Sequence, residues 1–94
     1  MKTFKEYILD EKFVGEQAIY MPHGAIVVNV SESNKGLILL AIATPEACTV
    51  DLPEIRTFKI CATDEIFYAN TVKYIGSFKS ELGIKHVIEI IKEY

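Results

Sequence analysis

The sequence predicts a mainly β fold, a small antiparallel sandwich or barrel of about six to seven strands, with one C-terminal helix (α+β) as an open alternative. Two observations favour this class. Runs rich in β-branched and aromatic residues follow one another at short intervals, separated by turn residues, which is typical of β-dominated domains. The chain has 94 residues, half of them apolar and 24% charged, which suits one domain, residues 1–94, with a buried core.

Five segments carry the clearest strand signal. Each is short, rich in residues of high β propensity and bounded by turn residues, such as those of the Pro-His-Gly turn at 22–24. The expected strands cover residues 17–21, 25–30, 36–44, 54–62 and 71–79. Two prolines bracket the segment 45–53, which we expect to be a loop.

Side-chain alternation predicts which residues of two strands share one face. In the strand 25–30 these residues are Ile26, Val28 and Val30. In the strand 71–79 the residues expected to face inward are Val72, Tyr74, Gly76 and Phe78.

The two ends of the chain are ambiguous. The apolar residues of the segment 3–9 fit a helical turn as well as a strand. The segment 84–94 has apolar residues at both helical and strand spacing. Its isoleucine content favours a strand, and a terminal helix remains the alternative.

The segment 37–43 is apolar without alternation, so both of its faces are expected to be buried. A chain this short has little material with which to cover two faces of one sheet. We therefore expect a homo-oligomer, and a dimer above all, because two-fold interfaces are the commonest.

Charge and cysteine content exclude several classes of protein. Thirteen acidic and ten basic residues give a net charge of −3, and no basic run is present, so nucleic-acid binding is not expected. The longest apolar stretch is too short to span a membrane. With two cysteines and no apolar leader after Met1, the expected location is a reducing cytoplasm.

Three short motifs together resemble a small domain family of unknown function found in bacteriophages and prophages. They are Met-Pro-His-Gly-Ala at 21–25, Arg-Thr-Phe-Lys-Ile at 56–60 and Tyr-Ile-Gly-Ser-Phe at 74–78. The resemblance covers residues 16–78. It departs from the family at 62–65, where Ala-Thr-Asp-Glu stands in place of the frequent Gly-Thr-Gly-His. The resemblance implies a short β-rich phage accessory protein in the host cytoplasm, and it supplies no catalytic residues.

No residue pattern predicts a metal site, a cofactor or an enzyme. Cys48, Cys61, His23 and His86 lack the paired spacing of structural zinc ligands. Cys61 falls on an expected strand and is interpreted as a small buried hydrophobic residue. The scattered glycines form no phosphate-binding loop.

Arg56, the only arginine, is the main ligand-binding candidate, with Lys73 and Lys79 as further candidates. A guanidinium beside Phe58 could hold a phosphate or carboxylate with two parallel hydrogen bonds. The competing interpretation is that Arg56 pairs with Glu54 or Asp51 and fixes the end of its strand. Lys59 is expected on the opposite face of that strand.

The resemblance, together with the absence of a catalytic pattern, implies a bacteriophage accessory protein that acts by binding, such as a host-takeover or anti-defence inhibitor that engages a host protein. One alternative is a protein that sequesters a small anionic signal, for example a nucleotide second messenger, at a subunit interface. Another is a minor virion component.

Overall fold

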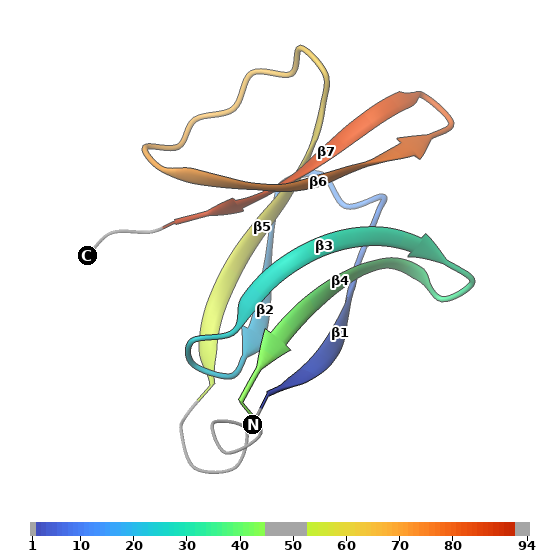
Figure 1. The fold of residues 1–94 in the computed structure, drawn as a ribbon. Coiled ribbons are helices and arrows are strands. Elements are labelled where there is room, and N and C mark those ends of the chain that lie inside the picture. Colours follow the sequence, from blue (N-terminus) through green and yellow to red (C-terminus); the bar gives the residue numbers. More distant parts are fainter. Residues whose placement is uncertain (1, 45–52, 92–94) are drawn as a thin grey trace.

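The computed structural model describes residues 2–44 and 53–91, and this part of the chain consists of seven β-strands and no helix (Figure 1). The strands are β1 (Thr3–Leu9), β2 (Glu16–Met21), β3 (Ile26–Ser33), β4 (Gly36–Ala43), β5 (Glu54–Ala62), β6 (Val72–Ser80) and β7 (Gly83–Ile90). The mainly β fold class is confirmed, and both ambiguous segments, 3–9 and 84–90, lie in strands. Residues 45–52 and 92–94, which include most of the expected loop at 45–53, lie outside the described residues.

The strands form two antiparallel sheets that pack face to face as a sandwich (Figure 1). The three-stranded sheet has the order β1-β4-β3, and the four-stranded sheet has the order β2-β5-β7-β6. Along one side of the sandwich the edge strands β3 and β6 contact each other. The turn at 22–24 leads from the four-stranded to the three-stranded sheet; Gly24 has a φ of 79°, and the Ala25 amide donates to the Pro22 carbonyl at 3.1 Å.

The hydrophobic core lies between the two sheets and draws on the inner face of every strand. Fully buried side chains dominate it, and aliphatic residues from the three-stranded sheet meet aromatic and aliphatic residues from the other. Its largest members are Leu9, Met21, Leu37, Leu39, Phe58 and Val87. Burial of each such side chain contributes about 1.5–3 kcal/mol to folding.

The central strand β4 is apolar on both faces, as the sequence predicts. Leu37, Leu39, Ala41 and Ala43 point into the core. Ile38, Leu40 and Ile42 lie on the outer side of the sheet. There Ile42 has the apolar neighbours Phe4 and Ile26, and Ile38 has Ile8, whereas Leu40 lies between Glu6 and Asn29. We call the set Phe4, Ile8, Ile26, Ile38, Leu40 and Ile42 the outer apolar face.

The face predicted for the strand 25–30 is wrong because β3 contains a bulge between Val27 and Asn29. The extra residue reverses the alternation. Val27 and Val30 are therefore buried, whereas Ile26 and Val28 are exposed.

The faces predicted for the strand 71–79 are partly wrong, because β6 contains a second bulge, between Tyr74 and Gly76. Phe78 is buried as expected, but Val72 and Tyr74 are exposed. Their register partners Ile90 and Ile88 lie on the same, outer face of the four-stranded sheet. Both bulges thus fall on the edge strands that meet each other.

Gly76 lies where these two edge strands contact each other. A Cβ atom built on Gly76 would lie 2.9 Å from Val30 Cγ1, closer than real Cβ contacts. The missing side chain of Gly76 therefore lets β6 pack against β3.

Candidate functional site

Arg56 lies on β5 at one end of the sandwich, and its guanidinium is enclosed by hydrogen-bond acceptors. Its Nε and Nη2 donate to the two carboxylate oxygens of Glu89 on β7, with Nη2 2.9 Å from Oε1. Its Nη1 donates to the Ala25 carbonyl and, at 3.3 Å, to Glu54 Oε1. The side chains of Arg56 and Glu89 are only 14% and 5% exposed. Arg56 therefore joins β5, β7 and the residue that precedes β3.

This arrangement gives the guanidinium a structural role. The hydrogen bonds that Arg56 donates to Glu89 raise the pKa of Arg56 further above its ordinary value, so the group stays charged. Of the two partners expected from sequence, Glu54 is one, and Asp51 lies outside the described residues. The main partner, Glu89, escaped sequence analysis because it lies 33 residues away along the chain.

The structure brings together Arg56 and Lys73 but not Lys79. Arg56 and Lys73 line a depression of about 750 Å³ at this end of the four-stranded sheet. Glu54 and Glu89 line it as well, so its charges balance. Lys79 pairs with Ile84 near the other end of β6. The three candidates form no common anion site within one protomer.

Cys61 and His86 are register partners on the outer face of the four-stranded sheet. Burial raises the pKa of the Cys61 thiol, which keeps it protonated and poorly nucleophilic at neutral pH. The His86 ring hydrogen-bonds with Thr63 Oγ1 and Tyr74 Oη, both at 2.9 Å. Both ring nitrogens of His86 thus have hydrogen-bond partners, as is typical of a histidine with a structural role.

The other two metal-ligand candidates lie apart from this pair. His23 Nδ1 lies 3.2 Å from Glu54 Oε2, and Cys48 lies outside the described residues. Within 2–44 and 53–91, no three histidine, cysteine or acidic side chains are grouped to hold a metal ion.

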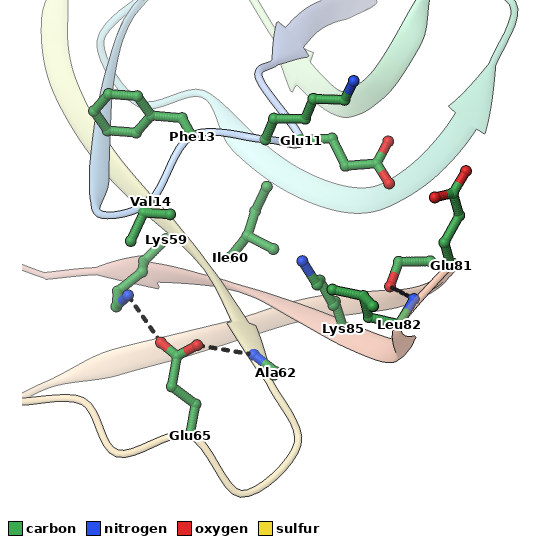
Figure 2. Close-up of a pocket in the computed structure, with 12 residues that line it drawn as sticks. Glu11, Phe13, Val14, Lys59, Ile60, Ala62, Glu65, Glu81, Leu82 and Lys85 are labelled. Carbon is green, nitrogen blue, oxygen red and sulfur yellow. Dashed lines mark hydrogen bonds and ion pairs between the residues drawn. The ribbon is translucent and has the colours of Figure 1, made fainter.

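A second depression, of about 480 Å³, lies at the other end of the sandwich (Figure 2). The β1–β2 loop, the C-terminal end of β5 and the β6–β7 turn surround it. Its lining residues are Glu11, Lys12, Phe13, Val14, Lys59, Ile60, Ala62, Glu65, Ser80, Glu81, Leu82 and Lys85. We call this region the loop-end depression.

Apolar side chains stand on two loop tips that border the loop-end depression. Val14 and Leu82 are 91% and 89% exposed, and Phe13 is also exposed. Two large apolar side chains exposed at the border of one depression form a candidate contact surface. Lysine and glutamate surround them in equal number, three of each.

Hydrogen bonds hold both tips in place. In the β1–β2 loop, the Asp10 amide donates to Gln17 Oε1 at 2.9 Å, and Gln17 Nε2 donates back to the Asp10 carbonyl at 2.8 Å. In the β6–β7 turn, the Ser80 hydroxyl donates to the Gly83 carbonyl at 2.7 Å and accepts from the Leu82 amide at 3.2 Å. The tips are therefore ordered before any partner arrives.

An ion pair shapes the remaining wall of the loop-end depression (Figure 2). Lys59 Nζ lies 3.0 Å from Glu65 Oε2, and the Ala62 amide donates to Glu65 Oε1 at 3.3 Å. The lysine, and then the amide, lower the pKa of Glu65 below its ordinary value. As expected, Lys59 lies on the face of β5 opposite to Arg56.

Sequence analysis did not single out the apolar tips. The segments 10–16 and 80–83 look like ordinary turns, and only Phe13, Val14 and Leu82 within them depart from turn composition. That signal does not reveal that the two turns lie beside each other.

The described part of the chain contains no helix able to span a lipid bilayer. No family model, no curated protein and no solved structure matches this chain.

Proposed function

We propose that this domain acts by binding another protein, with the loop-end depression as its contact site. Val14 and Leu82 serve as the apolar anchors of that contact, and the surrounding lysines and glutamates form its polar rim. In line with the resemblance to a phage domain family, the partner is a protein of the bacterial host, and the domain inhibits it as part of host takeover or of a counter-measure against host defence.

The exposure of Val14 and Leu82 on two braced tips is the observation that carries this proposal. Interfaces between proteins that also exist separately combine an apolar centre with a polar rim, which is the composition of the loop-end depression. Ordered tips also reduce the conformational entropy that is lost on binding.

A small anionic ligand has less support as the partner. The three lysines of the loop-end depression are balanced by three glutamates, so no net positive potential attracts an anion. At the other end of the sandwich, acidic residues and a backbone carbonyl already accept the hydrogen bonds of Arg56 that could clamp such a ligand.

The test identifies the partner and then measures its affinity. The tagged domain is used to capture proteins from a bacterial lysate, and the captured protein is purified and titrated by calorimetry. We expect Leu82→Asp to weaken binding at least tenfold while leaving the fold intact, because this side chain makes little contact within the domain. Val14→Asp should do the same.

Tyr20→Ser is the matched control. Tyr20 is also an exposed large side chain, but it lies on the outer face of β2, away from the loop-end depression. Its variant should bind with unchanged affinity. Equal binding by Leu82→Asp, Val14→Asp and the wild type would refute the proposed site. A nucleotide that co-purifies with the domain would favour the sequestering alternative.

A further inference from the structure

The outer side of the three-stranded sheet is a second surface with exposed apolar side chains, which lie on its edge strands, whereas Ile38 on the central strand is only 5% exposed. Phe4, Ile42 and Ile26 form one apolar cross-strand row. Ile8 and Ile38 form another that ends at Ser31, and Leu40 lies between these rows with Glu6 and Asn29 beside it. Phe4 and Ile8 are 67% and 62% exposed. The strand at 83–90 pairs within the other sheet, so no C-terminal helix lies over this face.

Charge is almost absent from this face. Among the side chains that share its cross-strand rows, Glu6 is the only ionisable one, and it faces Leu40 from the edge strand β1. An edge position keeps the carboxylate at the rim of any contact, where it remains in water. By contrast, the loop-end depression combines apolar residues with six charged ones.

We propose that the outer apolar face is the two-fold interface of a homodimer. Interfaces between copies that are always paired are more apolar than interfaces with separate partners, and they resemble a domain core divided in two. The composition of the outer apolar face is that of an interface between permanently paired copies. The composition of the loop-end depression is that of an interface with a separate partner. The two surfaces lie on different parts of the domain, so the dimer goes beyond the proposed function and does not depend on it.

The size of the face favours a second copy as its occupant. Strand spacings of about 4.8 Å and a rise of about 3.4 Å per residue give a sheet plane of about 15 by 25 Å. Two such planes total about 750 Å², and protruding side chains increase this area toward the lower end of the range for stable specific interfaces, about 1,200 Å² in total. A partner must therefore cover the whole face, and a second copy supplies a plane of the same dimensions.

The chemistry of the outer apolar face also favours a second copy of the chain as its partner. Few soluble proteins expose a flat apolar surface of this kind, whereas every copy of this chain carries one. Two sheets pack face to face readily when their strands lie at about −30° to each other. The resulting dimer would place four sheets in two stacked sandwiches and leave both loop-end depressions open to solvent.

Size-exclusion chromatography coupled to light scattering tests this proposal. At micromolar concentration, the wild type should elute with twice the mass of the 10.6 kDa chain. Ile8→Lys and, separately, Phe4→Lys place a charge in the interface and should each give the mass of one chain. Because both side chains are exposed, the variants should keep the far-ultraviolet circular dichroism of the wild type.

Ile55→Lys is the matched control. Ile55 is comparably exposed but lies on the outer face of the four-stranded sheet, beside Tyr20. Its variant should remain a dimer. A monomeric wild type, a larger assembly, or a dimer that Ile55→Lys disrupts as readily as Ile8→Lys would overturn the proposal. Unchanged partner affinity in the Ile8→Lys monomer would show that the proposed contact site is independent of the dimer.

Discussion

Replacement of Arg56 by methionine removes the group that neutralises a carboxylate inside the sandwich. Glu89 is 4% exposed, and the guanidinium of Arg56 contacts both of its oxygens. The Arg56→Met variant leaves that carboxylate and the Ala25 carbonyl without their partner. Loss of one member of a buried ion pair costs about 3–5 kcal/mol. The neighbouring depression admits water, so we expect the lower end of that range, about 3 kcal/mol.

Urea denaturation measures this loss. A domain of 94 residues has a free energy of unfolding of roughly 5–14 kcal/mol, so the variant remains folded and measurable. With a urea m-value of about 1.5 kcal/mol/M, the unfolding midpoint should fall by about 2 M. The peripheral partner provides the control: Glu54→Gln should lower the stability by less than about 1 kcal/mol, because Glu54 is partly exposed.

The double variant Arg56→Met/Glu89→Leu should recover most of the lost stability, because apolar residues of similar volume replace a buried ion pair at little cost. A loss below about 1 kcal/mol in Arg56→Met would refute the reasoning. It would mean that Glu89 is solvated and that the guanidinium is free to bind a ligand. That result would favour Arg56 as an anion-binding residue.

Two further predictions concern single contacts. Gly76→Ala should destabilise the domain by about 1–3 kcal/mol, because its Cβ would meet Val30 Cγ1 at 2.9 Å; in a double-mutant cycle, Val30→Ala should relieve part of that loss, and strictly additive losses would contradict the proposed clash. The lowered pKa of Glu65 means that its ion pair stabilises the fold above the pKa of the unfolded chain, about 4.3, and that this contribution disappears as the pH falls through the folded value. Wild type should therefore exceed Glu65→Gln in stability at pH 7 but not at about pH 3, and a pH-independent difference in denaturation would argue against the Lys59 contact.

The sequence predicted the strands well because their composition and turn residues are local signals. The two faces of β4 could be assigned from the apolar run 37–43 alone, since a regular strand alternates strictly. For β3 and β6, alternation failed at Val28 and Tyr74, because a bulge adds one residue and no local pattern marks its position. The faces of edge strands are thus harder to predict than those of central strands.

Long-range contacts limited the prediction of the site in a different way. The lone arginine was identified as special, but its role depends on Glu89, which reaches it only through the pairing of β5 with β7. Val14 and Leu82 likewise border the same depression only through the tertiary structure. Residue type identified Arg56, whereas topology alone determines what it binds.

The pairing pattern of the strands also determines when the loop-end depression can exist during folding. The hairpins β3–β4 and β6–β7 close short loops, whereas β1 pairs with β4 and β2 pairs with β5 across long stretches of chain, for example Thr3 with Ala43 and Glu16 with Lys59. Closing a long loop costs more conformational entropy, so such pairings are formed later and more slowly than local hairpins. The loop that carries Val14 connects the two strands that depend on these distant pairings. A newly made chain therefore presents both apolar tips at the loop-end depression only after β2 has paired with the distant strand β5.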